Sequence, residues 1–321
     1  MSPPTLAEQV AVEQVAPNEY VSKALPIRMG NSMPIAYGGC TIAVAVSAAC
    51  ATVAGDLKPY SILGHFHGPA ATNQPLRCFV EHTRTTRSFA TRRVQVKQAQ
   101  KDGSLRTCLE LMADFHVAEK ESVVEYSPPP AAAWAQPDDC PSTGEHARRL
   151  RDRGVVSEAE FVEFTTKLGA NAHLFDTRAC LNGVAGQNLA GAARGAPTTQ
   201  DALPMTAKVS AEWQRSRARL PTPAANVAAL AFLMDGALSF IPLTHGGMWF
   251  DDVGACSTLD FALRLCVPDV DMEAWTLKER FTTRAGSARS YSEGRLWDAK
   301  GQLVASMTQQ SILRPKKGPK M

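Results

Sequence analysis

Three features that would assign the chain to a familiar class are missing from its sequence. The N-terminal segment, MSPPTLAEQVAVEQ, has neither a basic start nor an apolar core, so it does not resemble a secretory signal. No apolar run reaches the roughly 20 residues needed to cross a membrane. The formal net charge is only +3, and the one dense basic run, 148–153, adjoins acidic residues. We therefore expect a soluble, intracellular protein that neither inserts into a membrane nor binds nucleic acid.

The eight cysteines contain no C-x-x-C pair. Without a secretory route, this spacing predicts free, buried thiols and indicates neither a disulfide framework nor a zinc site. The 321 residues are enough for one large domain or for two domains of ordinary size.

What the sequence does contain is a long stretch of small and apolar residues, 224–245, with one carboxylate, Asp235, inside it. An unpaired buried charge costs several kcal/mol, so Asp235 is the first candidate for chemistry. Asp235-Gly236 alone would suit a hairpin turn. The flanking alanines favour a buried helix instead, beginning near Pro223 and ending near Pro242.

A second run of this kind, 37–53, predicts another buried helix that opens with Gly38 and Gly39. Strand-like segments follow at 60–68, 76–98 and 105–117, with a turn at Asp102-Gly103. The second half repeats this order: the helix around Asp235 is followed by strand-like segments 256–267 and 274–314. Gly103 and Gly301 are then 198 positions apart. Such helices need a sheet wrapped around them, so the repeats should pack as a pseudo-dimer.

The middle of the chain differs from both repeats. A Pro- and Ala-rich linker precedes a charged, helical stretch from Thr143 to Leu168, in which Ser157 and Glu160 have capping-box spacing. Gly183 to Pro204 reads as a long, mobile loop. These features divide the chain into an N-terminal unit (1–126), a connecting region (127–204) and a C-terminal unit (205–321).

Six short segments resemble the type II acyl-CoA thioesterases of bacteria and peroxisomes, which have a double hot-dog fold. They are Tyr37-Gly-Gly-Cys40 for F-G-G-Q, Arg84-Thr-Thr-Arg-Ser-Phe-Ala-Thr-Arg-Arg-Val94 for R-x-G-x-S-F-x-x-R-x-V, Phe232-Leu-Met-Asp235 for A-Y-x-S-D, His245-Gly246 for P-H-G, Ser257-Thr-Leu-Asp260 for A-[ST]-x-D-H, and Val304-Ala-Ser-Met-Thr-Gln309 for V-A-S-x-x-Q. The resemblance implies an α+β fold with two long antiparallel sheets, each wrapped around a buried central helix.

The resemblance also implies a catalytic group, Asp235, Thr258 and Gln309, which hydrolyses an acyl-CoA thioester with an activated water and needs no metal or cofactor. A desolvated carboxylate is a suitable general base, and the hydroxyl and amide can orient the water. At the offset of the repeats, Gln309 falls near Leu111 and Thr258 near Tyr60, so we expect one site per chain. The expected substrate-binding residues are Gly38, Gly39, Leu63, His65, Arg84, Arg87 and Phe261.

Within this set, Gly38 and Gly39 would supply N–H groups to the developing oxyanion, and Arg84 and Arg87 would either meet the phosphates of coenzyme A or lie in solvent. His65 and His67 would either line the pocket or form half of a metal site.

The sequence departs from the family pattern at three places. Leu63 stands where the family commonly has histidine, Cys40 replaces the Gln of F-G-G-Q, and Phe261 follows Asp260 in place of histidine. These changes leave open a tailoring or release enzyme for a carrier-bound polyketide or other secondary-metabolite thioester. A non-catalytic acyl-CoA-binding protein is a further alternative, against which the three catalytic matches argue.

The last residues, Pro319-Lys320-Met321, are close to a peroxisomal S-K-L address, apart from the proline. Two locations therefore stay open, the peroxisome and the cytoplasm. A peroxisomal protein would have the import receptor as a partner. The family resemblance also raises a homo-oligomer as an expectation.

Overall fold

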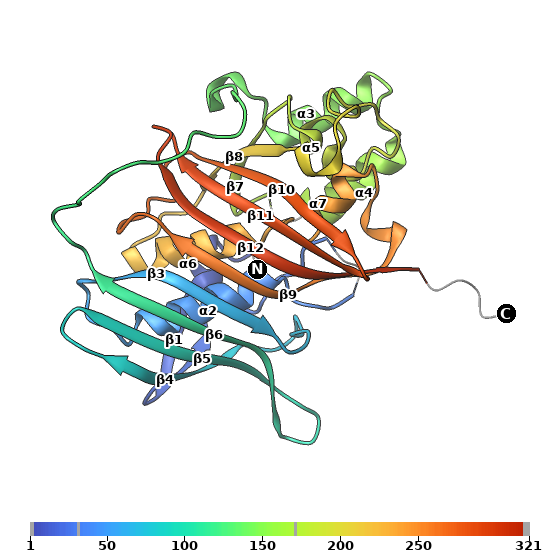
Figure 1. Cartoon of the computed structure of the whole chain (residues 1–321). Helices are drawn as coiled ribbons and strands as arrows, with labels where there is room; N and C mark the ends of the chain where they lie inside the picture. The colour runs from blue at the N-terminus through green and yellow to red at the C-terminus, as the bar shows by residue number, and fades with distance from the viewer. Residues whose placement is uncertain (1–2, 31–32, 170–171, 317–321) are drawn as a thin grey trace.

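A computed structural model describes residues 3–30, 33–169 and 172–316, and its strands form one antiparallel sheet (Figure 1). The strand order is β1-β2-β4-β5-β6-β3-β9-β12-β11-β10-β8-β7. The strands are β1 (Val12–Ala16), β2 (Glu19–Ser22), β3 (Leu57–Phe66), β4 (Arg77–Thr85), β5 (Phe89–Ala99), β6 (Leu105–Val117), β7 (Phe175–Ala179), β8 (Ser210–Ser216), β9 (Val253–Leu265), β10 (Thr276–Gly286), β11 (Arg289–Asp298) and β12 (Leu303–Pro315). The helices are α1 (Leu6–Val10), α2 (Gly38–Cys50), α3 (Thr143–Asp152), α4 (Glu158–Lys167), α5 (Val184–Gln187), α6 (Pro223–Asp235) and α7 (Ile241–His245).

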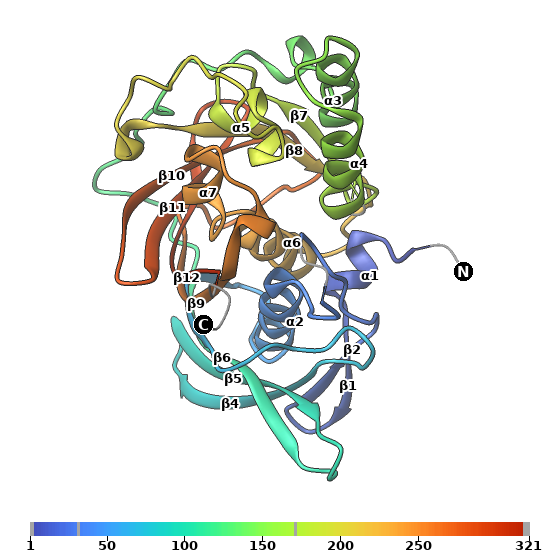
Figure 2. The same ribbon diagram turned by 90° about the vertical axis from the view of Figure 1, so that its right-hand side faces the viewer.

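The two predicted sheets meet edge to edge. β3 of the N-terminal half pairs with β9 of the C-terminal half, with Leu63 opposite Ala262 and His65 opposite Asp260. Each half-sheet curves around one helix, and α2 and α6 lie side by side inside the combined sheet (Figure 2). The pseudo-dimer of two helix-and-sheet repeats is therefore present, with a continuous sheet across its centre.

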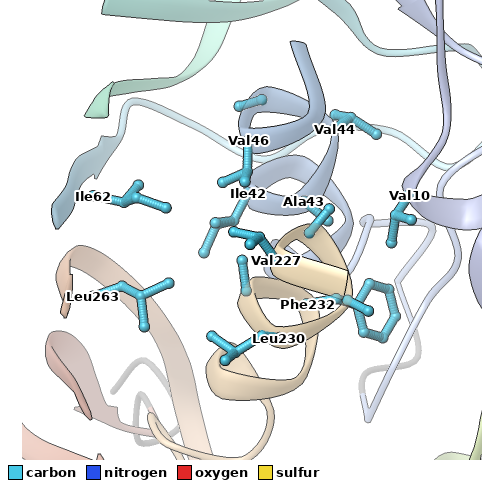
Figure 3. Packing of buried hydrophobic residues seen from close by; sticks show 14 of the residues in the cluster. Val10, Ile42, Ala43, Val44, Val46, Ile62, Val227, Leu230, Phe232 and Leu263 are labelled. Atoms are coloured by element: carbon cyan, nitrogen blue, oxygen red, sulfur yellow. The ribbon is translucent and has the colours of Figure 1, made fainter. Parts of the chain in front are cut away.

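The core lies between the two helices and the sheet (Figure 3). Ile42 of α2 and Leu230 of α6 are fully buried, as are Ile62 and Leu263 from the two central strands. Burying one such side chain contributes about 1.5–3 kcal/mol, so the interface between the repeats is a major part of the core. Because partners surround both helices, neither needs a polar face.

The helix prediction for residues around Asp235 is confirmed, but its predicted end at Pro242 is wrong. α6 stops at Asp235, because Gly236 is extended and Ala237 adopts a positive φ of 62°. Pro242 instead lies in the first turn of the next helix, α7. Asp235 is thus the last residue of a buried helix, where its side chain can face a strand of the sheet.

The repeat offset aligns the strands but not the helices, because the connection from α6 to β9 (236–252, with α7) is longer than the one from α2 to β3 (51–56). Gln309 pairs with Phe261 in β9 as Leu111 pairs with Gly64 in β3. The two strand positions are therefore equivalent, as the sequence predicted.

The connecting region is more ordered than predicted. Its charged part forms two helices, α3 and α4, with capping boxes at Ser142 and at the predicted Ser157. The segment 183–204, expected as a loop, contains α5 and a 3-10 turn, Leu189–Gly191, and buries apolar side chains against α3 and α4. β7 pairs with β8 and adds a strand to the sheet. The boundaries at 126 and 204 stay a prediction.

In the described part of the chain, no helix is long and apolar enough to cross a membrane. Pro319, Lys320 and Met321 lie outside the described residues.

Candidate active site

Asp235 forms one end of a short chain of hydrogen bonds inside the C-terminal repeat. The Gln309 amide Nε2 donates to Asp235 Oδ1 over 2.7 Å. Thr258 Oγ1 donates to the carbonyl oxygen of the same Gln309 side chain over 3.2 Å. The structure thus brings together the three residues that the sequence analysis grouped.

A β-bulge places Thr258 beside Gln309. β9 and β12 pair regularly from Phe261 opposite Gln309 to Asp260 opposite Gln310, and the register then shifts so that Thr258 lies opposite Ser311. Leu259 is the extra residue, and it interrupts the alternation of the strand. As a result both Phe261 and Thr258 face the helices, although they are an odd number of positions apart.

Burial makes the Asp235 carboxyl a stronger base than an ordinary aspartate. The side chain is only 6% exposed, and desolvation raises its pKa. Four groups oppose this rise: the Gln309 amide, the charge of Lys278, the Gly39 N–H and the Thr258 hydroxyl. They favour the ionised form and hold it in one orientation.

Gly38 and Gly39 lie where the N-terminus of α2 meets the C-terminus of α6. A Cβ on Gly38 would come within 2.8 Å of Asp235 Oδ2, and one on Gly39 within 2.6 Å of the Phe232 carbonyl oxygen. The Gly39 N–H is a hydrogen-bond donor to the Asp235 carboxylate. In the structure this bond supports the base, and the oxyanion role expected for the two glycines stays a prediction.

Phe66 lies beside the carboxylate, and Phe261 packs next to Phe66. Phe66 Cζ lies 3.0 Å from the position of a Gly38 Cβ, and the Phe66 ring is 6.1 Å from that of Phe261, centroid to centroid. Phe261 in turn lies over Gly64, which has no side chain to block it. Phe261 was predicted, but Phe66 was missed. Because residues two and four positions apart on a strand share a face, the buried Ile62 would have indicated that Phe66 faces the same way.

Leu63 and His65 lie on the opposite face of the sheet. Leu63 is 39% exposed and pairs with Met112 and Ala262, and His65 is exposed and pairs with Glu110 and Asp260. Neither reaches Asp235, so the predicted pocket role is not supported for them. Among the described residues, no cluster of three or more His, Cys, Asp or Glu side chains is arranged to hold a metal.

Arg84 and Arg87 lie at the far end of α2 from Asp235. The Arg84 carbonyl accepts a hydrogen bond from Arg92, which also bonds Thr52, just beyond the C-terminus of α2. The 13 residues of α2 span about 20 Å. The Arg84 guanidinium stacks over Phe89, 4.6 Å from the ring centroid, and Arg87 is exposed. The structure does not bring these arginines to the catalytic group.

Two family models match most of the chain. The model described as the acyl-CoA thioesterase N-terminal domain matches residues 25–116, and the one described as the acyl-CoA thioesterase C-terminal domain matches residues 169–313. The chain belongs to the type II acyl-CoA thioesterase family. It is therefore a thioester hydrolase with a double hot-dog, α+β fold.

Several solved structures have the same fold. An acyl-CoA thioesterase II, TesB2, from Mycobacterium marinum is 22% identical, with a TM-score of 0.68 over 98% of this chain and 100% of its own. A tesB protein from Mycobacterium avium subspecies paratuberculosis is 20% identical, with a TM-score of 0.68 over 97% of this chain and 98% of its own. A hot-dog protein of unknown function from Alicyclobacillus acidocaldarius is 17% identical, with a TM-score of 0.65 over 98% of both chains. Among curated proteins, none matches the sequence significantly.

Proposed function

We propose that this family member hydrolyses acyl-CoA esters and that Asp235, Thr258 and Gln309 activate the attacking water. The observation that carries the proposal is the continuous set of hydrogen bonds from Thr258 through Gln309 to the buried carboxylate. The Gln309 amide is satisfied at both ends, so its orientation and that of Asp235 are fixed before substrate arrives.

In this mechanism Asp235 acts as the general base. Its carboxylate takes a proton from water while the water oxygen attacks the thioester carbonyl carbon. The tetrahedral intermediate then collapses, the carbon–sulfur bond breaks, and the proton on Asp235 passes to the departing sulfur. The products are a free acid and coenzyme A. Asp235 is almost closed off from solvent whereas Thr258 is partly exposed, so the thioester would approach from the Thr258 side.

Thiol release from a panel of acyl-CoA esters, from short to long and aromatic, tests this function. Asp235→Asn should lower kcat/KM by about 10²- to 10⁴-fold, which is the usual contribution of a general base. Asp114→Asn is the matched control. Asp114 accepts a hydrogen bond from the Thr91 hydroxyl over 2.6 Å, much as Asp235 does from Thr258, but it lies in the other repeat. Its activity should match wild type.

Full activity of Asp235→Asn would overturn the assignment of the base. If no acyl-CoA ester is hydrolysed, the same variants should be compared on acyl groups bound to a carrier protein. If only the carrier-bound acyl groups are hydrolysed, the substrate is an acyl thioester of a carrier protein and not an acyl-CoA ester. Peroxisomal import through Pro319-Lys320-Met321 and a homo-oligomer stay separate proposals.

A further inference from the structure

Lys278 of β10 is buried directly behind the catalytic carboxylate. Its side chain is only 1% exposed, and its Nζ donates hydrogen bonds to the carbonyl oxygens of Leu233 and Gly236, the latter at 2.8 Å. These two carbonyls come from the last turn of α6 and from the residue after it. They therefore flank Asp235 in sequence, and Lys278 closes the end of the helix that carries the base.

The same helix end is also held by Tyr37. Its hydroxyl donates to the Phe232 carbonyl oxygen at 2.6 Å. Three carbonyls at the end of α6 are thus satisfied by side chains from outside the helix. A cation at this end also opposes the negative end of the helix dipole.

The N-terminal repeat has no counterpart of this lysine. Ser292 pairs with Gln309 as Val94 pairs with Leu111, so these two positions of β11 and β5 are equivalent. Their partners Thr282 and Val80 are then equivalent too, and four positions before them Lys278 corresponds to Leu76. The buried cation thus occurs in the repeat that carries Asp235, whereas the other repeat has a buried leucine. Burying an ammonium group is costly, which argues for a specific role.

Four ionisable groups act on or surround Lys278. Asp235 faces it from α6, Tyr37 from the start of α2, Arg280 from its own strand and Glu212 from β8. Glu212 is already paired with Arg280 at 2.9 Å, whereas Lys278 forms no salt bridge among the described residues. Its charge is therefore available to Asp235. Burial first, and then Arg280, lower the Lys278 pKa to about 7, while Glu212 and Asp235 act to raise it.

We propose that Lys278 is a positioning residue for the hydrolysis: its ammonium group fixes the last turn of α6 and keeps the Asp235 carboxylate ionised. The proposal rests on Asp235 as the general base, which is itself proposed above. A purely structural lysine would need only its hydrogen bonds, whereas this role needs its positive charge. The two can be separated experimentally.

Three variants separate charge from hydrogen bonding. Lys278→Gln keeps donor hydrogens without the charge, and Lys278→Arg keeps the charge. Lys208→Met is the matched control, because the Lys208 Nζ also donates to a carbonyl at a helix end, that of His245 in α7, at 3.0 Å. The Asp235 pKa is read directly from its ¹³C carboxyl signal by NMR, and the acid limb of kcat/KM is recorded in parallel.

In Lys278→Gln the Asp235 pKa and the acid limb should both rise by about 1 to 3 pH units, as expected for loss of a nearby opposite charge. Lys278→Arg and Lys208→Met should keep the wild-type values. An unchanged Asp235 pKa in folded Lys278→Gln would overturn the proposal. Because NMR reads the carboxyl group without turnover, this result stays distinct from failure of Asp235 as the base.

Wild-type protein offers a test that needs no variant to fold. The Asp235 carboxyl signal should move a second time at the pH where the ε-carbon signal of Lys278 shows loss of its proton. A carboxyl signal that does not respond to that titration would also contradict the proposed charge coupling.

Discussion

The amide of Gln309 and the carboxylate of Asp235, 74 positions apart in the chain, meet at 2.7 Å through Nε2 and Oδ1. Gln309 faces inward from β12, and its other amide atom accepts from Thr258. The equivalent position of the first repeat is Leu111, which can form neither bond. This inward position is therefore one of the differences between the repeats: Gln309 can hold a carboxylate in place, whereas Leu111 can only pack.

Replacing Gln309 should weaken catalysis more than folding. Gln309→Ala removes both hydrogen bonds and frees Asp235 and Thr258 to rotate, and loss of such orientation should cost about 10²-fold in kcat. Gln310→Ala is a close control, because Gln310 is the next residue of β12 but is exposed on the opposite face. Steady-state thiol release checks both variants. Equal activity of the two would show that Gln309 does not orient the site.

A side chain at position 38 should impair catalysis, because it would crowd the Asp235 carboxylate. A Cβ there would lie 2.8 Å from Asp235 Oδ2 and 3.0 Å from Phe66 Cζ, so Gly38→Ala should displace the carboxylate and lower kcat at least roughly tenfold. Gly144→Ala is the control at another helix start, where a Cβ meets nothing within 4 Å. It should leave kcat unchanged and slightly raise the melting temperature, since alanine favours the helix. Wild-type kcat in Gly38→Ala would contradict the predicted crowding.

The sequence was sufficient to find the two buried helices, because their small and apolar residues leave no polar face. It was sufficient to single out Asp235 because one carboxylate interrupts the second of these runs. The end of α6 was misplaced, since the turn signal at Asp235-Gly236 was set aside in favour of a longer helix, and the bend itself depends on a positive φ at Ala237. Leu63 and His65 were named from the family resemblance, which does not show which face of a strand a residue occupies; β3 places both on the exposed face, beyond a bulge near Tyr60.

Lys278 was missed for a different reason. Three consecutive charged residues, 278–280, stand between Leu277 and Phe281 in β10, and such a run is typical of a segment exposed to solvent. In the structure both faces are covered: Lys278 lies against α6, while Glu279 on the other face accepts hydrogen bonds from Ala131 and Trp134 of the proline-rich linker. A segment more than 140 positions away thus determines that this strand is buried, and local patterning cannot reveal it.

The ionised Asp235 carboxylate should lower the stability of the folded protein at neutral pH. Its carboxyl pKa is raised by burial, so the folded state holds the proton more tightly than the unfolded state does. Its favourable contribution is present below the ordinary pKa of 3.8 and is lost as pH rises through the folded pKa. At neutral pH, Asp235→Asn should therefore melt higher than wild type, with a gain that shrinks as pH falls. A lower melting temperature than wild type at pH 7 would show that ionised Asp235 is a net stabilising group.

His245 should make the protein sensitive to mild acid. It is buried at the end of α7, its Nε2 lies 2.9 Å from Ser210 Oγ, and no partner reaches Nδ1 in the described residues. Burial first, and then the charges of Arg280 and Lys208, lower its pKa from 6.5 to about 3. The stability that the neutral ring contributes is complete above pH 6.5 and is lost as pH falls towards 3.

This titration should reduce the free energy of unfolding by about 1.4 kcal/mol for each pH unit below 6.5. Urea unfolding between pH 6.5 and 5 measures the slope before most carboxylates take up protons. His245→Gln retains an amide that can bond Ser210 but cannot titrate, so its slope should be smaller by that amount. His65→Gln, at an exposed position, should keep the wild-type slope. If wild type and His245→Gln have the same slope, His245 takes up its proton without opposing the fold, and its burial next to Arg280 and Lys208 is not the source of acid sensitivity.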